Sequence, residues 1–439
     1  MRIAMVGAGY VGLVSGACFA EFGGEVCVVD AVAEKIEALH RGIMPIYEPG
    51  LDALVEENVR DGRLTFTTSL EEAVKGADAV FLAVGTPSRR GDGHADLSYV
   101  YAAAEQVAKA AQGPLVLVTK STVPVGTGRR VQEIVRKARP DLAIEVASNP
   151  EFLREGSAIG DFMRPDRVVI GTMEGAGGER AAAVLRRLYR PLNLIEVPIL
   201  ATRIETAELI KYAANAFLAV KITFINEIAD LCEKVGADVH DVARGIGLDG
   251  RIGRKFLHPG PGYGGSCFPK DTLALARTAQ DFGSPVRLVE TTIAVNDARK
   301  EDLARRVTEA CGGSVEGRTI AVLGLTFKPE TDDMRESPSL VLVPSLVAAG
   351  ARVRAFDPQG IEHARPLLPA AVEYATSALD AAQGADALVL LTEWSEFRGL
   401  APSRLKAAMR GDVLLDFRNV YDPAAMREAG FAYRSIGRP

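Results

Sequence analysis

The strongest constraint on the fold of this chain is a glycine-rich turn that joins an apolar run to a helix-like segment at the N-terminus. Residues 2–6 (RIAMV) are typical of a buried strand, and the turn places Gly7, Gly9 and Gly12 in GxGxxG spacing. A helical pattern follows, and the next apolar run ends at Asp30. In this order, glycines let a pyrophosphate approach a helix N-terminus, and the acid accepts hydrogen bonds from ribose hydroxyls. The sequence therefore predicts a Rossmann-type domain. It favours NAD over NADP, because a carboxylate repels a 2′-phosphate; a glycine turn that binds nothing is the alternative.

The same pattern recurs near the C-terminus. The segment RTIAVLGLTFK resembles RIAMVGAGYVG, GARVRAFDP resembles GEVCVVDA, and GADALVLLTEW resembles GADAVFLAVGT. Such a repeat predicts a second Rossmann-like half. It retains only Gly324 of the glycine fingerprint and carries Lys328 and Arg335 nearby, so we expect a different, nucleotide-bearing ligand there. The alternative is a purely structural duplicate.

A long helical stretch separates the two halves. Residues from about 201 to 235 contain no proline and many helix formers, and shorter helical pieces continue to about 297. We therefore expect an α/β fold with two Rossmann-like parallel-sheet domains, at 1–200 and 301–439, joined by a central helical region at 201–300 with a long spine helix. Lys211 and Asn215 share a face of that helix. They could orient an oxygen-bearing substrate, or they could be a surface or capping pair.

Small polar residues follow two further predicted strands. Gly85, Thr86 and Pro87 end one of them, and Ser121 and Thr122 end the other. Ligands bind at the carboxyl ends of strands in open α/β sheets, so we expect these loops to line one crevice. The stretch 88–98 between them is predicted to be a mobile loop.

Cys267 follows two glycines and a serine and precedes a proline in the run GGSCFPKD. Proline favours the first turn of a helix, so the thiol is expected at a helix N-terminus, where the positive end of the dipole favours thiolate. Asp271 is about one turn further along. Cys267 is therefore a candidate nucleophile, and a buried small apolar side chain is the alternative.

Composition excludes several other classes of protein. The net charge of -6 argues against a broad nucleic-acid-binding surface. No run approaches about 18 apolar residues, so we expect no membrane span. The five cysteines show no CxxC spacing and no nearby histidine pairs, which argues against a metal site. Their odd number, and a strand that begins at residue 2 without a signal peptide, favour the cytoplasm.

Together these motifs resemble the UDP-glucose/GDP-mannose dehydrogenase family, and within it the UDP-glucose 6-dehydrogenases. The motifs GAGYVG, VGTP, STVPVG, NPEFLREG, a KxxxN helix, GYGGSCFPKD and FKPETDDMRESPS occur in that order, from about residue 1 to 420. Ser266 and Phe268 flank Cys267. The enzymes for UDP-N-acetylmannosamine typically have histidine before this cysteine, and those for GDP-mannose more often have leucine after it. Both remain alternatives.

The resemblance implies a four-electron oxidation of UDP-glucose to UDP-glucuronate that reduces two NAD. Cys267 would trap the aldehyde as a thiohemiacetal and carry the acyl group as a thioester. Lys211 and Asn215 would lie near the reacting oxygen. Asp271, Thr122 and Glu151 would surround the hydrolytic water, and the role of general base stays open among Glu151, Asp271 and Lys211.

The resemblance also implies the binding residues and an assembly. The expected cofactor residues are Gly7, Gly9, Tyr10, Val11, Gly12, Asp30, Lys35, Gly85, Thr86, Pro87, Ser121, Thr122, Glu155 and Arg335. The expected UDP-sugar residues are Glu151, Phe152, Leu153, Arg154, Lys211, Asn215, Arg251, His258, Tyr263, Gly264, Phe327, Lys328 and Arg418. A homodimer is expected in which Arg251 can reach the neighbouring subunit. For Arg418, a surface ion pair is the alternative.

Two other classes of function stay open at this stage. A one-step β-hydroxyacid dehydrogenase also places Lys and Asn four apart after a Rossmann domain, but it gives no role to Cys267 or to the second Rossmann-like half. A non-enzymatic nucleotide sensor could keep the folds and lose the chemistry. The presence of Cys267, Lys211, Asn215 and Asp271 argues against the sensor.

Overall fold

The computed structural model describes residues 1–89 and 92–438, which form two compact units. The first unit contains residues 1–214 and 277–284, and the second contains residues 215–276 and those from 285 onward. Residues 90 and 91 of the predicted mobile loop lie outside the described residues. The described part of that loop pairs Ser88 with Ala95 in an isolated antiparallel bridge, and its predicted mobility stays a prediction.

The first unit is built on an eight-stranded sheet of order β3-β2-β1-β4-β5-β6-β7-β8. The first six strands are parallel and have the Rossmann order. The predicted parallel sheet is correct for these six, whereas β7 pairs antiparallel with β6 and then parallel with β8. The strand bounds are β1 Arg2–Val6, β2 Glu25–Val29, β3 Leu64–Thr67, β4 Ala79–Leu82, β5 Leu115–Thr119, β6 Ile144–Ser148, β7 Val168–Thr172 and β8 Ile199–Arg203.

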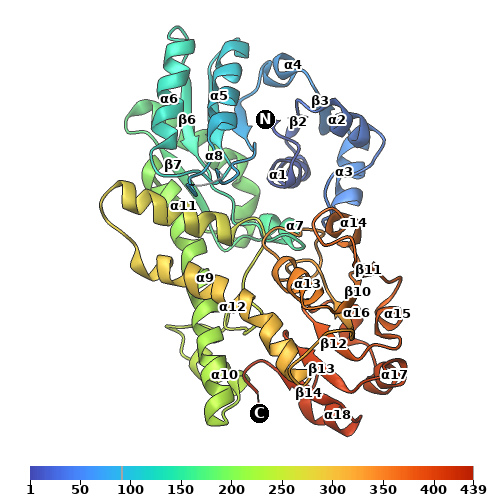
Figure 1. The fold of residues 1–439 in the computed structure, drawn as a ribbon. Coiled ribbons are helices and arrows are strands. Elements are labelled where there is room, and N and C mark those ends of the chain that lie inside the picture. The colour runs from blue at the N-terminus through green and yellow to red at the C-terminus, as the bar shows by residue number, and fades with distance from the viewer. Residues whose placement is uncertain (90–91, 439) are drawn as a thin grey trace. The chain divides into compact units, whose positions relative to one another are not determined.

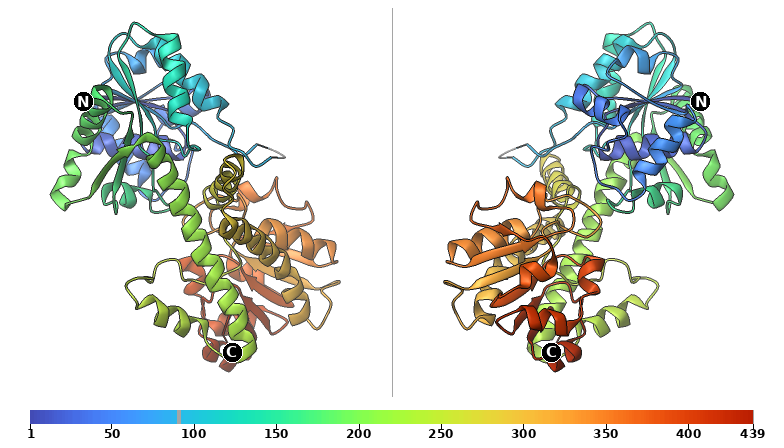
Figure 2. Two further views of the ribbon diagram at one scale, coloured as in Figure 1. Left: turned by 90° about the vertical axis from the view of Figure 1, so that its left-hand side faces the viewer. Right: turned by 90° about the vertical axis from the view of Figure 1, so that its right-hand side faces the viewer.

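Helices cover both faces of this sheet (Figure 1). Side chains alternate across a strand, so Ile3 and Met5 pack against one helix layer while Ala4 faces the other. The strands run between the two layers in both views of Figure 2. One layer contains α4 (Leu70–Val74), α5 (Ser98–Ala110) and α6 (Thr127–Ala138); the other contains α1 (Tyr10–Glu21), α3 (Leu51–Arg60), α7 (Ala158–Met163) and α8 (Ala176–Leu188). The remaining helices are α2 (Ala33–His40) and the 3-10 helix η1 (Arg190–Ile195).

The second unit contains a six-stranded sheet of order β11-β10-β9-β12-β13-β14. Every pair in it is parallel, and its order repeats that of the first six strands of the other sheet. The predicted second Rossmann-like half is therefore confirmed. Its strands are β9 Thr319–Leu323, β10 Arg352–Phe356, β11 Glu373–Tyr374, β12 Ala387–Leu390, β13 Val413–Asp416 and β14 Ala432–Ser435. Its short helices are α13 Ser339–Ala348, α14 Ile361–Ala364, α15 Ala378–Ala382, α16 Ser395–Arg398, α17 Pro402–Ala408 and α18 Pro423–Glu428.

The acid at the end of the second strand differs between the two halves. Asp30 accepts backbone N–H groups from Ala8 at 2.8 Å and Val32 at 3.0 Å. Asp357, in the equivalent place after β10, is buried, and its oxygens accept hydrogen bonds from several groups within the protein, including the indole of Trp394 at 3.2 Å. The hydrogen-bonding capacity of the Asp357 carboxylate is thus used within the protein. Asp357 therefore offers no open carboxylate to a dinucleotide ribose at the end of β10.

Four helices form the predicted central region: α9 (Ile204–Val235), α10 (Val239–Gly247), α11 (Phe268–Asp281) and α12 (Arg287–Ala310). The long spine helix is confirmed as α9. It begins later than residue 201, because residues 199–203 pair with β7 as strand β8. The predicted domain boundaries at residues 200 and 300 stay predictions. No helix of the described residues is long and apolar enough to cross a membrane.

Buried Glu208 fixes the first turns of α9. Its two carboxylate oxygens accept N–H groups from Gly126 at 2.8 Å and Gly128 at 2.7 Å, at the N-terminus of α6. Burial raises the pKa of Glu208 to about 7, although both hydrogen bonds act to lower it. This contact holds the start of α9, which carries Lys211, against the start of α6, which follows Thr122. It therefore helps to position two predicted site residues.

Candidate active site

The glycine turn at the start of α1 has one position that its own packing leaves open. Gly7 has φ +108°, and a Cβ there would lie 2.7 Å from the Ala83 oxygen. A Cβ at Gly12 would lie 1.9 Å from the Gly7 oxygen, whereas a Cβ at Gly9 would meet nothing within 4 Å. The turn itself therefore requires Gly7 and Gly12, and Gly9 leaves space at the helix N-terminus, where a pyrophosphate fits.

The groups around this turn also fit NAD. The Asp30 carboxylate accepts the N–H of Ala8, within the turn, and the Lys35 amine lies 3.6 Å from it. After β4 and β5, the Thr86 hydroxyl donates to the Thr122 carbonyl at 3.0 Å, and the Ser121 hydroxyl donates to the Val84 carbonyl at 2.6 Å. The structure thus brings together the two loops that the sequence analysis assigned to one crevice, including Gly85 and Pro87.

Replacing Gly9 with alanine is expected to weaken NAD binding at least about tenfold without unfolding the protein. The added methyl group would meet no protein atom within 4 Å, so it would occupy only the space in which a pyrophosphate is predicted to lie. NAD titration by protein fluorescence and a thermal unfolding curve measure the two effects. Gly12→Ala is the contrasting variant: its Cβ collides with backbone, so we expect a lower unfolding temperature. Parent affinity in Gly9→Ala would place the cofactor elsewhere.

Tyr10 joins the glycine turn to the segment after β6. Its hydroxyl bonds to Glu48, and the Gly156 N–H lies 3.1 Å from the Tyr10 oxygen and 2.6 Å from a Glu48 oxygen. Burial, followed by the Glu48 carboxylate, raises the pKa of Tyr10, which keeps the phenol protonated. The predicted cofactor residue Glu155 precedes Gly156, and Val11 follows Tyr10.

A buried ion pair joins the segment after β6 to α9. The Glu151 carboxylate lies 3.0 Å from the Lys211 amine, and their side chains are 5% and 3% exposed. Burial acts to raise the pKa of Glu151; the Lys211 charge, the Leu153 N–H at 2.5 Å and the Lys120 charge outweigh it and lower the pKa. Glu151 is therefore a buried carboxylate that stays ionised, beside a cation able to stabilise an oxyanion.

The next residues of this segment are held by cations and anions of the same unit. The Phe152 ring centre lies 3.5 Å from the Arg167 guanidinium carbon and 5.3 Å from the Lys211 amine. Arg154 forms an ion pair with Asp161 at 2.6 Å. Of the predicted group from Glu151 to Arg154, the first two residues therefore lie next to Lys211.

In the second unit, Cys267 immediately precedes α11. Its carbonyl accepts the Asp271 N–H at 2.8 Å, so the thiol is at the helix N-terminus, as predicted. Its sulfur lies 3.4 Å from the Ser266 hydroxyl. Cys267 is partly exposed, whereas the other four cysteines are buried. Burial raises the pKa of each of those four, to about 12 for Cys18, which disfavours thiolate.

Asn215 and Asp271 come together beside this helix start. The Asn215 amide donates to one Asp271 oxygen at 2.7 Å, and the Lys270 amine donates to the other at 2.5 Å. Both Asn215 and Asp271 are buried. Asn215 lies one turn after Lys211 on α9, so that helix contributes one predicted catalytic residue to each unit.

The glycine loop before Cys267 packs against the segment after β9. A Cβ at Gly265 would lie 2.6 Å from the Phe327 ring, and one at Gly264 would lie 2.4 Å from the Glu336 oxygen. The Tyr263 N–H donates to the Asn296 side chain at 2.8 Å. Glycine is thus required at 264 and 265 because another backbone and an aromatic ring approach closely.

Arg418 lies against the same segment. Its guanidinium donates to the carbonyls of Phe327 and Leu391, both at 2.7 Å, and lies 3.1 Å from Glu393. Its side chain is mostly buried, which differs from an exposed surface pair. The Lys328 amine lies 5.4 Å from the Phe327 ring centre.

Three predicted binding residues of this unit are more exposed. Arg251 is 91% exposed and pairs with Asp249 at 2.6 Å, and His258 is also exposed. Arg335 pairs with Asp333 at 2.8 Å, and its side chain is largely exposed. These contacts do not test the predicted binding roles of the three residues, which stay predictions.

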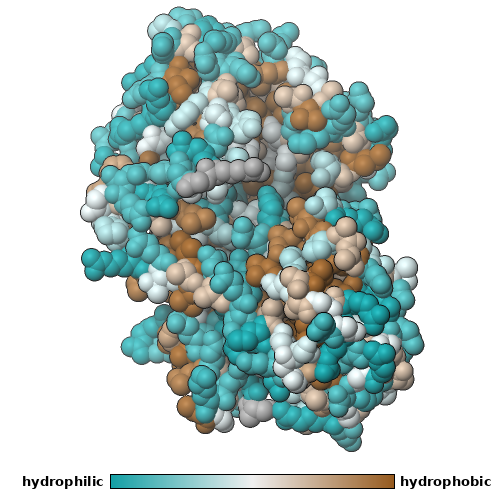
Figure 3. Space-filling view, in the orientation of Figure 1, coloured by the Kyte–Doolittle hydropathy of each residue, from teal (hydrophilic) through white to brown (hydrophobic). Residues whose placement is uncertain are grey.

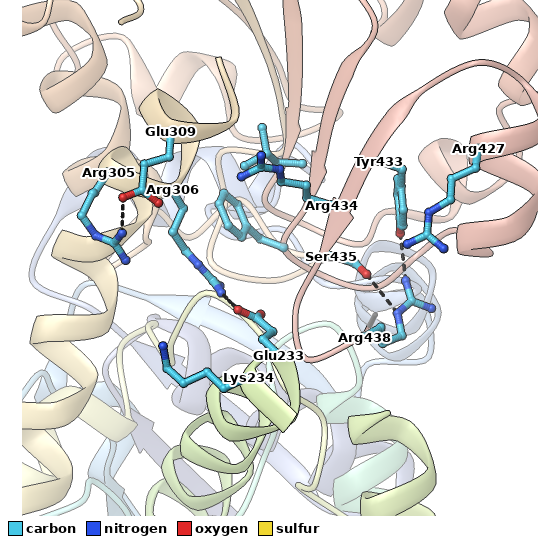
Figure 4. A pocket seen from close by; sticks show the side chains of 12 residues that line it. Glu233, Lys234, Arg305, Arg306, Glu309, Arg427, Tyr433, Arg434, Ser435 and Arg438 are labelled. Carbon is cyan, nitrogen blue, oxygen red and sulfur yellow. Dashed lines mark hydrogen bonds and ion pairs between the residues drawn. The ribbon is translucent and has the colours of Figure 1, made fainter. Parts of the chain in front are cut away.

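A cavity of about 400 Å³ in the second unit contains none of the predicted site residues (Figure 4). Most of its charged side chains bond within the protein: Arg306 pairs with Glu233, Arg305 with Glu309 at 2.5 Å, and Arg438 donates to the Tyr433 hydroxyl at 2.8 Å. We assign no ligand to it. No group of three or more His, Cys, Asp or Glu side chains in the described part of the chain is arranged to hold a metal ion.

One buried titratable residue, whose charge acts on the Glu151–Lys211 pair, was not identified from the sequence. Lys120 ends the strand run LVLVTK and is buried. Local sequence patterns assign lysine to the surface. The run of apolar residues before Lys120 is the sequence signal that could have indicated its burial.

Comparison with known proteins covers the whole chain. Residues 1–193 match the NAD binding domain of the UDP-glucose/GDP-mannose dehydrogenase family, residues 205–298 its central domain and residues 321–423 its UDP binding domain. The chain is 62% identical over 439 residues to UDP-glucose 6-dehydrogenase from Rhizobium meliloti (strain 1021), and the match covers 100% of both.

Solved structures show the same similarity. A UDP-glucose dehydrogenase from Pyrobaculum islandicum is 40% identical, has a TM-score of 0.91 and is covered to 98%, with 100% of this chain covered. A UDP-D-ManNAc dehydrogenase from Pyrococcus horikoshii is 28% identical, with a TM-score of 0.86 and coverage of 100% of this chain and 99% of that one. The predicted cofactor, NAD, and the predicted class, an NAD-dependent oxidoreductase, are confirmed. With three consecutive domain matches and a 62% identical relative of equal length, this chain belongs to the UDP-glucose/GDP-mannose dehydrogenase family.

Proposed function

We propose that this protein oxidises the C6 alcohol of UDP-glucose to the carboxylate of UDP-glucuronate in two NAD-dependent steps. The observation that supports it most is Cys267, a partly exposed thiol at the N-terminus of α11 near the Asn215–Asp271 pair. A one-step oxidation of an alcohol needs no such thiol, whereas a covalent acyl intermediate does. UDP-glucose is favoured over UDP-N-acetylmannosamine by the higher identity of its enzymes to this chain.

The first oxidation depends on the Glu151–Lys211 pair. NAD, when bound, accepts a hydride from C6 in each oxidation. As the alcohol loses its proton, the Lys211 ammonium stabilises the developing negative charge on oxygen, and Asn215 donates to the same oxygen. Glu151, Asp271 and Lys211 each remain candidates for accepting that proton. A general base must lie within hydrogen-bond distance of the proton and have a suitable pKa.

The second oxidation depends on Cys267. Its thiolate adds to the aldehyde carbon, a C–S bond forms, and the oxygen takes a proton to give a thiohemiacetal. Loss of hydride from that carbon and of the proton from its hydroxyl leaves a thioester. Water, held by Asp271, Thr122 and Glu151, then attacks the acyl carbon; the C–S bond breaks, the thiol is restored and the acid leaves. The aldehyde thus stays covalently bound between the two oxidations.

The second unit would bind the UDP-sugar. The match of residues 321–423 to a UDP binding domain supports this assignment. Phe327, beside Gly264 and Gly265, offers an aromatic face, and Arg418 and Lys328 supply fixed positive charge for the diphosphate. In the same proposal Phe152, Leu153 and Arg154 contact the sugar, whereas Glu155 and Arg335 contact the cofactor.

The decisive experiment is a substrate panel of UDP-glucose, UDP-galactose, GDP-mannose and UDP-N-acetylmannosamine, with NADH counted per sugar consumed. We expect turnover of UDP-glucose with two NADH per sugar. One NADH per sugar would overturn the two-step chemistry and favour a one-step dehydrogenase. Preferred turnover of GDP-mannose or UDP-N-acetylmannosamine would overturn the substrate, and no turnover on any sugar would favour the sensor.

A homodimer would use the exposed apolar stripe of α9. Phe217, Phe224 and Leu231 recur every seven residues and are 65%, 47% and 53% exposed. Side chains at this spacing form one seam along a helix, as in paired helices. Apolar residues, brown in Figure 3, lie among polar ones over the surface where Figure 1 places α9 and α10. In such a dimer, exposed Arg251 could reach the site of the neighbouring subunit.

Phe224→Glu is expected to convert the dimer into a monomer, because it places a charge in the centre of the seam. Light scattering after size-exclusion chromatography measures the mass. Tyr99→Glu is the matched control, since Tyr99 is an aromatic residue on α5 that is 58% exposed against 47% for Phe224, and it should leave the mass unchanged. A dimer that survives Phe224→Glu would contradict this interface.

We also propose the cytoplasm as the site of action. No disulfide links any of the five cysteines, all of which lie among the described residues, and this suits a reducing compartment.

A further inference from the structure

Lys120 has an unusual environment for a lysine. It follows β5 directly, and only 3% of it is exposed. Its amine donates to the Asn149 side-chain oxygen at 3.0 Å and to the Tyr189 hydroxyl oxygen at 3.1 Å. It also lies 5.7 Å and 5.8 Å from the ring centres of Phe162 and Tyr189. Two neutral acceptors and two aromatic rings thus enclose an amine that elsewhere would be in water.

Such burial is costly, because an ammonium ion loses its hydration. No carboxylate of the described residues forms an ion pair with Lys120 within 4.0 Å. Burial lowers the pKa of Lys120 to about 7; the charge of Glu151 opposes this shift, and the charge of Lys211 adds to it. The chain therefore retains a buried amine whose charged neighbours are the two members of the ion pair in the candidate active site.

The remaining titratable groups that face Lys120 stay neutral. Cys18 faces it from α1, and burial raises the pKa of that thiol to about 12. Tyr189 follows α8, and burial raises the pKa of its phenol as well. Glu151 after β6 and Lys211 on α9 are then the charges that act on Lys120, and on which Lys120 acts in return.

Asn149 connects Lys120 physically to Glu151. Its side-chain oxygen accepts from Lys120 and from the Tyr189 hydroxyl at 2.6 Å, and its amide donates to the Val169 carbonyl at 2.8 Å. Its backbone N–H donates to the Thr119 carbonyl at 2.9 Å. Asn149 is thus held on every side, and the chain continues through a proline, with its restricted φ, to Glu151.

We infer that Lys120 is a positioning residue for the Glu151–Lys211 pair: its buried amine holds Asn149, two residues before Glu151, and when protonated it adds a second positive charge that acts on the Glu151 carboxylate. The inference rests on the proposed function for the meaning of its kinetic readout. The charges of Lys211 and Lys120 both act to lower the pKa of Glu151, so its carboxylate remains ionised 3.0 Å from the Lys211 amine. In this inference Lys120 acts on the reaction through that pair.

The test is a double-mutant cycle between Lys120→Met and Glu151→Gln, measured as kcat and KM for UDP-glucose at saturating NAD. Methionine keeps the length of the side chain and removes the charge. We expect Lys120→Met to lower kcat about tenfold, with KM little changed, and to cost nothing further in the Glu151→Gln background. Lys109→Met, at an exposed lysine of the same unit, should leave kcat at the parent value in both backgrounds.

Three results would overturn the inference: an unchanged kcat in Lys120→Met, equal losses in both backgrounds, or a loss confined to KM. If Lys120→Met does not fold, Tyr189→Phe keeps the lysine and removes one of its acceptors. It should then show the same dependence on Glu151, with a loss of about threefold.

A second readout separates failure of this inference from failure of the proposed function. Urea unfolding of the same four proteins needs no substrate, and it should show coupling between positions 120 and 151. The pH dependence gives an independent sign. The unfolded lysine titrates near 10.5 and the folded one near 7, so the stability of the parent relative to Lys120→Met should rise as pH increases from about 7 to 10. Coupling without turnover would retain the Lys120 contact while the proposed reaction fails.

Discussion

Replacing Cys267 with serine is expected to stop the reaction after the first oxidation. A serine hydroxyl is a far weaker nucleophile than a thiolate at neutral pH, and the ester that it forms hydrolyses differently from a thioester. We expect turnover to acid to fall by about 10³-fold or more, on the scale of losing a covalent nucleophile. Stopped-flow counting of NADH per active site, with mass spectrometry of the sugar and of the protein, measures the outcome.

The control for this experiment is another cysteine of the same chain. Cys311 is buried, and burial raises the pKa of its thiol, so Cys311→Ala should retain two NADH per sugar. Turnover of Cys267→Ser at the parent rate would show that no thioester forms. If the parent released one NADH per sugar and Cys267→Ala did not change that number, the protein would be a one-step dehydrogenase.

Lys211→Met is expected to lower both activity and stability. The variant removes the cation beside the reacting oxygen, which should cost about 10²–10³ in kcat. It also leaves the buried Glu151 carboxylate without its partner at 3.0 Å, which should cost about 3–5 kcal/mol in the free energy of unfolding. Steady-state kinetics and urea unfolding measure the two losses separately.

The double variant Lys211→Met/Glu151→Gln is the internal control for stability. It leaves no unpaired buried charge, so it should be more stable than Lys211→Met while remaining inactive. Lys109→Met, which breaks an exposed ion pair, should change stability by less than about 1 kcal/mol. If Lys211→Met retained parent stability and kcat, the pair would have neither role.

The sign of the pH dependence follows from Glu151. Its folded pKa is below the ordinary value of 4.5, so the pair stabilises the parent fully above that pH. The stabilisation is lost as pH falls through the lower, folded value. Acid unfolding of the parent should therefore include a component that the double variant lacks.

The two Rossmann-like halves illustrate how far the sequence alone could go. Strand, glycine turn, helix and acid follow one another within a short segment, so the motif predicted a Rossmann-like domain around β1, and the internal repeat predicted a second one around β9. Asp30 and Asp357 end equivalent strands, and sequence treats them alike. Only the folded chain shows that Asp357 is enclosed by hydrogen bonds from loops far along the chain, whereas Asp30 accepts two backbone N–H groups near an open glycine.

The start of α9 marks a limit of local patterns. Residues 201–203 have helical neighbours, yet they form β8, because β7 offers a paired edge. The antiparallel direction of β7 has the same origin. Strand partners are chosen by segments distant in sequence, so periodicity cannot specify them.

Local patterns predicted the cofactor type, the two Rossmann-like halves and the candidate thiol, because each depends on residues within a few turns of one another, and the resemblance of the ordered motifs predicted the family. Tertiary structure alone decided which cysteine is accessible, that Glu151 and Lys211 form a buried pair, that Glu208 caps α6, and that Lys120 lies beside the pair as a buried amine. The physical reason is desolvation. The charge state and partners of a side chain depend on how much water the rest of the fold removes from it, and that water is displaced by residues from distant parts of the chain.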